Sequence, residues 1–511
     1  MVRIDGEHLS LENVRAVAHG ERVELDGHAR RKLEAAAAAL DAAMARGQTL
    51  YGINTGFGPF ARTRISDEEI DALQINLIRS HAVGFGDPLP VPVVRAMLVL
   101  RAHSLARGFS GVGPGLVESL LGLLESGITP VVPEHGSVGA SGDLAPLAHL
   151  GLALLGEGDV FVDGRRVPAQ QAMRERGLVP CHLARKEGLA LINGTQYMTA
   201  RGVLATEEAH LLLGAAQIAA AMSTEALFGS ANAFDARIHA IRPHPGQVAV
   251  AANLRVLLGG SEIVQSHAGC DRVQDPYSER CTPQVLGASL DALAHVETVL
   301  AIECDAVTDN PLVFPDTGDV LSGGNFHGQP VALALDHLSI AVAEIASLAE
   351  RRIFQLLYND VEALPRCLAT RPGVESGLMM VQYLAAALVS ENRTLGHPAT
   401  LDNVVTGGGV EDHNSLGSIA AARLPRLFRN VRGVLAGELL CAAEALDRHA
   451  PLRPAPATAA ARAAVRRVAP PLVADRPLAP DLEALAALET LAAIVEAVER
   501  TLGKPLRAAR A

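Results

Sequence analysis

The longest run without a helix breaker constrains the fold most. Residues 331–357 contain neither glycine nor proline, and apolar side chains would cover most of the circumference of a helix over this range. A helix that is apolar nearly all round is buried on all sides. Long segments without proline also span 202–226, 285–307 and 377–395, and a further segment, 414–450, contains a single proline. The pattern predicts a mainly α-helical chain built on a long multi-helix bundle, with bundle-to-bundle association between subunits.

The character of the chain changes near residue 200. Short helical patterns alternate with turns before this point, and the long helical runs follow it. We therefore predict a smaller N-terminal domain over 1–200 and a helical bundle with a C-terminal helical segment over 201–511. The stretch 451–480 is rich in proline, alanine and arginine and predicts a loop or a lightly ordered segment. A helical pattern returns over 481–502.

Composition and charge exclude several classes of function. The net charge of −12 without a block of like charge argues against a nucleic-acid partner. The six cysteines form no Cys-x-x-Cys pair, so we expect no metal centre and a reducing compartment. The N-terminus lacks the apolar core of a signal peptide, and no uncharged apolar run is long enough to span a bilayer. A soluble, cytoplasmic protein without a membrane partner is expected.

A glycine-rich stretch over 136–144 carries the most reactive arrangement in the sequence. Gly142 has no Cβ, so its nitrogen can approach the carbonyl carbon of Ala140 and close a five-membered ring. Loss of water then leaves Ser141 as a dehydroalanine with an exocyclic methylene. The product is a methylidene-imidazolone, an electrophile made without an external cofactor. Taken alone, Ala-Ser-Gly is a small-residue turn in most proteins, and Asp143 has two interpretations: it orients the loop or caps a helix at Leu144.

The surrounding residues favour the reactive interpretation. Gly-Ser-Val-Gly-Ala-Ser-Gly-Asp-Leu-Ala-Pro-Leu-Ala-His, over 136–149, resembles the signature of the aromatic amino acid ammonia-lyase and aminomutase family. Further motifs extend the resemblance from Tyr51 to His413, which is most of the chain. The resemblance implies a mainly α-helical homotetramer in which each active site draws residues from three subunits. It also implies a 4-methylidene-imidazol-5-one formed from Ala140, Ser141 and Gly142.

A second glycine-rich segment carries the expected catalytic base. Tyr-Gly-Ile-Asn-Thr-Gly-Phe-Gly, over 51–58, predicts a mobile loop. On residue type alone, Tyr51 is a loop tyrosine that packs its ring on a neighbour. The stretch resembles the family's tyrosine loop, which implies that Tyr51 removes the substrate β-proton and that the loop acts as a lid.

A polar stretch over 273–281 carries the expected carboxylate site. Val-Gln-Asp-Pro-Tyr-Ser-Glu-Arg-Cys resembles the family's Gln-Asp-x-Tyr-Ser-x-Arg, and Pro-Gln-Val-Leu-Gly follows as in the family. The resemblance implies that Arg280 binds the substrate carboxylate through its planar guanidinium. It also implies that Tyr277 and Gln274 lie near the amine and the prosthetic ring. Without that context, Arg280 is a surface arginine on a loop.

Three further residues are assigned by the resemblance alone. It implies that Asn193, in Asn-Gly-Thr, hydrogen-bonds the ring oxygen or the substrate. The resemblance also implies that Asn310, in Asp-Asn-Pro, joins the carboxylate network and that Phe326 lies against the electrophile. Taken alone, Asn193 marks a turn and Asn310 a helix cap.

Selection of the substrate ring is assigned to His81, Glu411 and Met379. Ser-His at 80–81, at the end of a helical pattern over 67–84, stands where members of the family that act on tyrosine carry His-Leu and members that act on phenylalanine carry Phe-Leu. Ser-His is the pattern of the members that act on histidine. Glu411 would orient an imidazole and share its proton, and Met379 would form an apolar wall. The simpler interpretations are a helix-end contact for His81, a solvated acid for Glu411 and core packing for Met379.

One segment departs from the family's pattern. Members that act on histidine carry Asn-Gln before Glu-Asp-His and Val-Ser-Met after it, whereas residues 409–416 read Gly-Val-Glu-Asp-His-Asn-Ser-Leu. The change removes amide side chains near the site, and Asn-Ser-Leu resembles the branch that acts on phenylalanine. Three consecutive glycines, 407–409, predict a flexible approach to Glu411.

Together the motifs imply a carbon–nitrogen lyase that eliminates ammonia from L-histidine and gives trans-urocanate. The amine would add to the Ser141-derived methylene, Tyr51 would remove a β-proton and Arg280 would hold the carboxylate. A 2,3-aminomutase acting on L-histidine or L-tyrosine remains an alternative because of Gly409 and Val410. A lyase acting on tyrosine or phenylalanine is a second alternative, and a helical scaffold that never forms the ring is a third.

Overall fold

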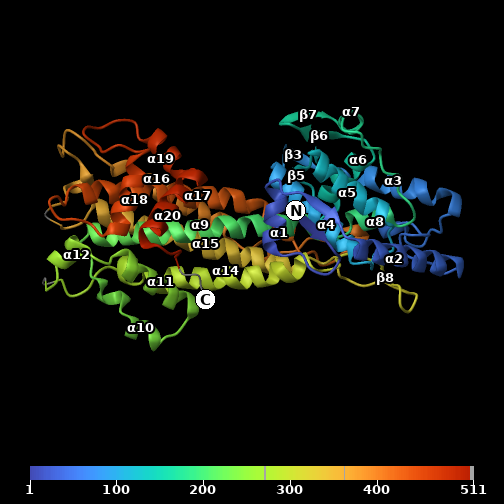
Figure 1. Ribbon diagram of the computed structural model, residues 1–511, viewed down its shortest axis with the longest axis horizontal. Helices are drawn as coiled ribbons and strands as arrows, with labels where there is room; N and C mark the ends of the chain where they lie inside the picture. Colours follow the sequence, from blue (N-terminus) through green and yellow to red (C-terminus); the bar gives the residue numbers. More distant parts are fainter. Residues whose placement is uncertain (270–271, 362, 507–511) are drawn as a thin grey trace. The chain divides into compact units, whose positions relative to one another are not determined.

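The chain divides into two compact units in a computed structural model that describes residues 1–269, 272–361 and 363–506, with the side chain of Pro59 left out. The first unit comprises 1–204, 297–336 and 398–422, and the second comprises 205–296, 337–397 and 423–511. Helices dominate both units (Figure 1), so the prediction of a mainly α-helical chain is confirmed. The division into domains over 1–200 and 201–511 stays a prediction; the first compact unit also includes two later segments.

The first unit is built around α4, Val91–Ala106. Every residue of α4 from Val93 to Ala106 is buried, because α1 (Leu11–Ala18), α2 (Gly27–Ala45) and α5 (Pro114–Ser126) pack against it. α1 connects β1 (Val2–Ile4) to β2 (Val23–Leu25), and these strands pair in parallel with Val2 opposite Val23.

Three helices of the first unit present the predicted site segments. α3 (Ile70–His81), α6 (Leu144–Leu154) and α8 (Glu187–Ile192) pack against one another. His81 ends α3, the Ala-Ser-Gly tripeptide precedes α6, and Asn193 follows α8 directly. Packing of these three helices therefore brings together segments that are far apart in the sequence.

Short strands and turns complete the first unit. β3 (Phe85–Pro88) pairs antiparallel with β5 (Pro133–His135), and β8 (Leu312–Phe314) pairs antiparallel with β9 (Asp319–Leu321). A third sheet has the order β4-β6-β7, with α7 beside β6 and β7 (Figure 1). The bounds of the remaining elements are β4 Thr129–Pro130, β6 Asp159–Val162, β7 Arg165–Pro168, α7 Ala169–Glu175, η1 Gly58–Phe60, η2 Asp67–Glu69, η5 Ala399–Leu401 and η6 Gly407–Gly409.

Long helices form the second unit. The boundary between the units falls within α9 (Gln196–Ala226), α14 (Thr282–Cys304), α15 (Gln329–Leu357) and α17 (Gly417–Asp447). Inside the second unit, the Ser289 hydroxyl of α14 donates to the carbonyl of Ala341 in α15 at 2.8 Å, which ties two of these helices together. The shorter elements are η3 Ala231–Phe234, α10 Ala236–Ala240, α11 Pro245–Leu257, α12 Glu262–Ser266, α13 Tyr277–Arg280, η4 Arg366–Leu368 and α16 Met379–Leu395.

The C-terminal part of the second unit corrects one prediction. The sequence predicts a loop or a lightly ordered segment over 451–480, but this stretch contains α18, Pro456–Arg466, which packs against α20, Leu488–Leu502. Proline at the first helical position begins a helix rather than breaking it, and the buried Ala457, Ala461 and Ala464 form one apolar face. The helical pattern over 481–502 is divided between α19, Ala479–Ala486, and α20.

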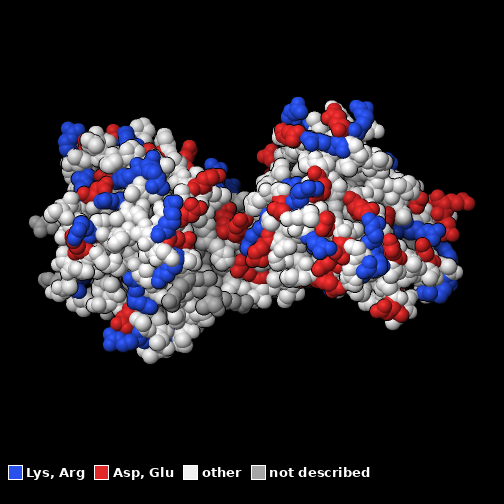
Figure 2. Space-filling view, viewed as in Figure 1, with Lys and Arg blue, Asp and Glu red and all other residues white. Residues whose placement is uncertain are grey.

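α15 does not reach the burial expected for 331–357 within one chain. Leu333, Ile340 and Phe354 stay exposed, at 54%, 45% and 40%. α14 and α15 also have the length and apolar composition of membrane-spanning helices, a property that they share with core helices of soluble proteins. On the face shown in Figure 2, acidic and basic side chains of both units are interspersed.

Candidate active site

The Ala-Ser-Gly tripeptide lies in a tight loop before α6. Ser141 has a φ of 53° and Gly142 a φ of 80°, and both values lie in the left-handed region that side chains rarely adopt. A Cβ added at Gly142 would lie 2.1 Å from the carbonyl oxygen of Gly194. The backbone N–H of Asp143 donates to that same oxygen at 2.6 Å. The loop therefore lies directly against the Asn193–Gly194 backbone, which only glycine at 142 permits.

The residues around the tripeptide fit the cyclised group. When the Gly142 nitrogen joins the Ala140 carbonyl carbon, the carbonyl that remains in the ring is that of Ser141. Asn193 Nδ2 donates a hydrogen bond to this oxygen at 3.2 Å. Asn193 is 5% exposed, and its Oδ1 atom is buried without a hydrogen-bond partner among the described residues. The donor thus stands where the family resemblance implies contact with the ring oxygen.

Asp143 orients the loop and does not cap α6. Its side chain makes no capping bond to α6, although it precedes the first residue of that helix. Its carboxylate instead accepts the backbone N–H groups of Tyr197 and Met198, both at 3.0 Å, in the first turn of α9. The Ser418 hydroxyl also donates to this carboxylate, at 3.0 Å. Complete burial raises the pKa of Asp143 to about 7.

Glu411 lies at the tripeptide. Its Oε1 atom accepts the Ser141 hydroxyl at 3.2 Å, and its Oε2 atom accepts the Thr406 hydroxyl at 2.7 Å. The three glycines over 407–409 form the turn η6, which lies against η1 of the tyrosine loop. Gly407 has a φ of 57°, and a Cβ there would meet the Glu411 carboxyl carbon at 2.8 Å. Glycine at 407 therefore gives the carboxylate its space.

The charge of the Glu411 carboxylate also acts on the His81 imidazole. Its Nδ1 atom lies 2.9 Å from the Leu77 carbonyl oxygen, and a carbonyl accepts only, so Nδ1 carries the proton and Nε2 remains an acceptor. Burial lowers the pKa of His81, while the Leu77 hydrogen bond and the Glu411 charge act in the opposite direction. At neutral pH the imidazole is therefore neutral, with Nε2 as its acceptor nitrogen.

The tyrosine loop packs on α3 and α8. The Tyr51 phenol oxygen accepts the backbone N–H of Gly58 at 3.1 Å. Gln74 of α3 is fully buried; it donates to the Gly52 carbonyl at 3.3 Å and accepts the N–H of Leu189 in α8 at 3.1 Å. Gln74 thereby joins the tyrosine loop to the helix that precedes Asn193.

Asn310 is fixed from both sides. Its Oδ1 atom accepts the N–H of Gly323 at 2.7 Å, and its backbone N–H donates to the Asp309 carboxylate at 2.7 Å. Asp309 forms an ion pair with Lys186, and both side chains are fully buried. Burial lowers the pKa of Lys186, and Asp309 opposes that shift. Phe326 lies half-buried between β9 and α15.

A second buried cation supports Asn193. Arg101 of α4 is fully buried and donates to the Asn193 carbonyl at 2.8 Å and to the Gln196 side-chain oxygen at 3.1 Å. Burial lowers the pKa of Arg101 to about 10, and Asp309 acts to raise it. Asn193 and Asn310 are thus held by one buried group of charges, which comprises Arg101, Lys186 and Asp309.

The remaining predicted residues belong to the second unit. Tyr277 and Arg280 lie in the single turn of α13, and Met379 begins α16. Tyr277 is 71% exposed, and the Arg280 guanidinium carbon lies 4.6 Å from the centre of its ring. The Nε atom of Arg280 is buried and has no hydrogen-bond partner among the described residues. Gln274 is exposed in the segment before α13.

Comparison with known proteins identifies the family. The model of the family "Aromatic amino acid lyase" matches residues 9–467. The chain is 52% identical to a histidine ammonia-lyase from Symbiobacterium thermophilum over 499 residues, 98% of each chain. It is 51% identical to a histidine ammonia-lyase from Sorangium cellulosum over 98% of this chain and 99% of that protein.

The chain belongs to the aromatic amino acid lyase family. Solved structures in this family are similar throughout. A tyrosine aminomutase from Streptomyces globisporus has a TM-score of 0.93 at 38% identity and covers 99% of this chain and 100% of its own. A histidine ammonia-lyase from Trypanosoma cruzi has a TM-score of 0.90 at 39% identity, with coverage of 99% and 96%. The family resemblance stated from the motifs is confirmed.

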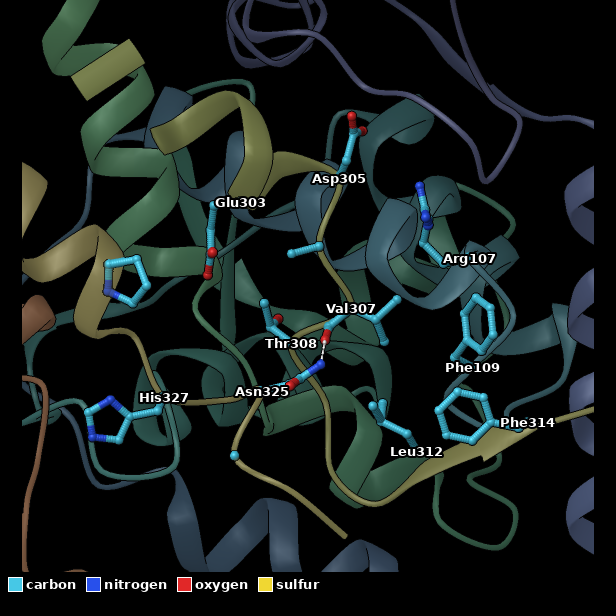
Figure 3. A pocket seen from close by; sticks show the side chains of 13 residues that line it. Arg107, Phe109, Glu303, Asp305, Val307, Thr308, Leu312, Phe314, Asn325 and His327 are labelled. Atoms are coloured by element: carbon cyan, nitrogen blue, oxygen red, sulfur yellow. Dashed lines mark hydrogen bonds between the residues drawn. The ribbon is translucent and has the colours of Figure 1, made fainter. Parts of the chain in front are cut away.

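The first unit also contains a cavity of about 600 Å³ that is not lined by the tripeptide. Figure 3 shows Phe109 and Phe314 on one side of it and Glu303 and His327 on the other. None of the predicted site residues is among the described residues that line it. The cavity borders the segments of Asn310 and Phe326 without including either residue.

The sequence analysis did not identify the buried residues that support the predicted site residues. Gln74, Arg101, Lys186 and Thr406 contact predicted site residues or their loops, yet none belongs to a motif that we identified. Lys186 stands in Ala-Arg-Lys-Glu, which is typical of a solvated surface run. The signal that was available is Asp309, which directly precedes Asn310 and requires a buried cation once that segment is buried.

Proposed function

We propose that this chain eliminates ammonia from L-histidine and releases trans-urocanate. The position of the Glu411 carboxylate carries the proposal. It accepts the Ser141 hydroxyl at 3.2 Å, and its negative charge acts to raise the pKa of the His81 imidazole. The Glu411 carboxylate at the tripeptide and the neutral imidazole nitrogen of His81 are two hydrogen-bond acceptors. They complement the two N–H groups of a protonated imidazole, whereas a phenol offers one donor and a phenyl ring none. The relatives named histidine ammonia-lyase support the same substrate.

The prosthetic group of the proposal is a methylidene-imidazolone from Ala140, Ser141 and Gly142, which supplies an electrophilic methylene carbon for the substrate amine. The left-handed loop and the Asn193 contact to the Ser141 carbonyl support this assignment. Intact mass of the purified protein tests it, because cyclisation removes two waters. A full unmodified mass in active protein would contradict the assignment.

The chain's own residues then bind the substrate and move its proton. Tyr51 Oη takes the β-proton, and the Gly58 N–H fixes the direction of the phenol oxygen. Arg280 pairs with the substrate carboxylate through its planar donors. Glu411 and His81 hold the imidazole, and Met379 forms an apolar wall. Gln274, Tyr277, Asn193, Asn310 and Phe326 shape the rest of the pocket.

Assembly and compartment are part of the proposal. A homotetramer with shared sites would cover exposed apolar side chains of the long helices, among them Ile340, Met380 and Tyr383. Light scattering on purified protein measures the subunit number directly. We place the protein in the cytoplasm because the five cysteines within the described residues are all free thiols; Cys270 lies outside them.

A substrate panel tests the function. Purified protein is incubated with L-histidine, L-tyrosine and L-phenylalanine, and the products are identified by NMR. We expect urocanate from L-histidine, with a kcat/KM at least about tenfold above the values for the other two substrates. The difference arises because each of those substrates loses at least one buried polar contact. Faster turnover of L-tyrosine or L-phenylalanine would overturn the substrate assignment.

A second candidate is a 2,3-aminomutase acting on L-histidine or L-tyrosine. The similarity to a structure named tyrosine aminomutase, at a TM-score of 0.93, and the Gly409-Val410 departure favour keeping it. The same NMR experiment separates the two candidates. A β-amino acid as the main product would identify the aminomutase.

A further inference from the structure

The helical turn that carries Arg280 is too short to be stable on its own. α13 has four residues, Tyr277–Arg280, and a helix of one turn is unstable without tertiary contacts. Its Ser278 carbonyl is held by two side chains from outside the turn. The Thr282 hydroxyl donates to it at 3.1 Å, and Nη1 of Arg352 donates to it at 3.2 Å. Ser278 itself is 6% exposed.

Arg352 is oriented by a buried ion pair between two long helices. Its Nε and Nη2 atoms donate to the two carboxylate oxygens of Glu438, at 2.5 and 2.9 Å. Arg352 belongs to α15 and Glu438 to α17, and both side chains are fully buried. The Ser223 hydroxyl of α9 donates to Glu438 at 2.8 Å. Because a guanidinium is planar, two bonds to one carboxylate fix the direction of Nη1 toward Ser278.

Stability alone does not account for this arrangement. A buried ion pair costs nearly as much in desolvation as it returns, and apolar residues of equal volume often replace such a pair without loss. What an apolar pair would not provide is the third donor, which reaches the α13 backbone. Two residues after Ser278, the Arg280 Nε atom is buried and has no partner among the residues that the structure describes. The network therefore fixes the backbone of a turn whose arginine keeps a donor for a ligand.

We propose that the Arg352–Glu438 ion pair is the positioning device of the substrate-carboxylate site. It holds the Ser278 carbonyl and so places the guanidinium of Arg280, without touching the substrate. The inference rests on the proposed role of Arg280 in binding the carboxylate of an amino acid. Arg352 and Glu438 are positioning residues in this scheme, and the contact through Ser278 transmits their effect.

The test compares a ligand that has the carboxylate with one that lacks it. The KM for L-histidine and the inhibition constant of L-histidinol, in which CH₂OH replaces the carboxylate, are measured for wild type, R352M and R352K. We expect the KM of R352M to rise about tenfold, because the turn loses a charged hydrogen bond, while the L-histidinol constant stays within about twofold. R352K keeps the charge beside Glu438 but loses the planar fork, so its KM should rise as well, by about fivefold.

Two further variants keep the test informative if R352M does not fold. T282V removes only the hydroxyl that donates the second hydrogen bond to the Ser278 carbonyl, and valine has nearly the same shape as threonine. This variant should raise the KM about two- to fivefold. R466M is the matched control. Arg466 is a mostly buried arginine of the same unit that pairs with Glu444 and Asp447, and both partners lie outside α13. Its loss should lower thermal stability and leave the ratio of the two constants unchanged.

R280M separates the two levels of the proposal. If R280M leaves the ratio of KM to the L-histidinol constant unchanged, the role of Arg280 fails and the inference falls with it. If R280M changes the ratio but R352M, R352K and T282V do not, the positioning inference alone is overturned. A parallel rise of both constants in the Arg352 variants, as from general loosening of the fold, would also overturn it.

Discussion

The Ser141 hydroxyl donates a hydrogen bond to the Glu411 carboxylate over 3.2 Å, although 270 residues separate the two along the chain. The Thr406 hydroxyl binds the other carboxylate oxygen at 2.7 Å. The carboxylate therefore lies at the tripeptide, and its Thr406 contact remains when cyclisation removes the Ser141 hydroxyl. A carboxylate has about four lone-pair positions, so it retains acceptor capacity for a substrate.

Glu411→Gln tests whether this carboxylate binds the imidazole. The amide keeps the shape but loses the charge, and a hydrogen bond to a charged group contributes about 1.5–3 kcal/mol. We expect kcat/KM for L-histidine to fall about 10- to 100-fold, while intact mass still shows the loss of two waters. T406V removes only the supporting hydroxyl and should cost less than about tenfold. Wild-type kcat/KM in E411Q would exclude Glu411 from ring binding.

Gly142→Ala tests the chemistry of the tripeptide. The new Cβ would lie 2.1 Å from the Gly194 oxygen, at a φ of 80°, so the loop has to move away from Asn193. We expect protein of unmodified mass and no measurable elimination. G115A is the control, because no atom lies within 4 Å of a Cβ at that helical position. A cyclised, active G142A protein would show that the close approach to Gly194 is not required.

Local patterns predicted the helices well and their contacts poorly. A run without glycine or proline over 331–357 predicted a helix, and α15 spans Gln329–Leu357. The chemistry of Ala-Ser-Gly likewise needed only neighbouring residues. Neither the choice between the two interpretations of Asp143 nor the role of Lys186 could be predicted, because their partners are distant in the sequence: those of Asp143 begin α9, and that of Lys186 is Asp309. Proline content misled us over 451–480, where Pro456 begins α18.

His81→Phe tests the choice of ring. The imidazole offers an acceptor Nε2 because the Leu77 carbonyl holds Nδ1, and phenyl offers none. An imidazole N–H left without a partner in a desolvated pocket costs about 1–3 kcal/mol. We expect the ratio of kcat/KM for L-histidine over L-phenylalanine to fall at least about fivefold. H135F, at an exposed histidine of the same unit, should leave the ratio unchanged. An unchanged ratio in H81F would remove His81 from ring selection.

Lys186→Met tests the buried charges behind Asn310. Asp309 would be left buried without its cation, which costs about 3–5 kcal/mol when one partner of a buried pair is removed. We expect a large fall in thermal stability for K186M and a partial recovery in K186M/D309N, where the uncompensated charge is gone. Thermal unfolding of wild type, K186M, D309N and K186M/D309N forms a double-mutant cycle that measures the coupling free energy of the pair. Equal losses in K186M and the double variant would show that charge compensation is not the reason.

Glu279→Gln tests a pH dependence of stability in the turn that carries Arg280. Burial, with the charge of Asp275, raises the pKa of Glu279 to about 8, and Arg272 and Arg352 act in the opposite direction. The folded state therefore holds a proton that the unfolded chain releases near its ordinary pKa of 4.5. Stability from this group is complete below about pH 4.5 and is lost as the pH rises through about 8.

The amide of the variant cannot ionise, so the melting temperature of E279Q should fall less than that of wild type between about pH 5 and pH 8. E12Q, at an exposed glutamate, should follow the wild-type profile. Parallel profiles for E279Q and wild type would mean that Glu279 is ionised throughout.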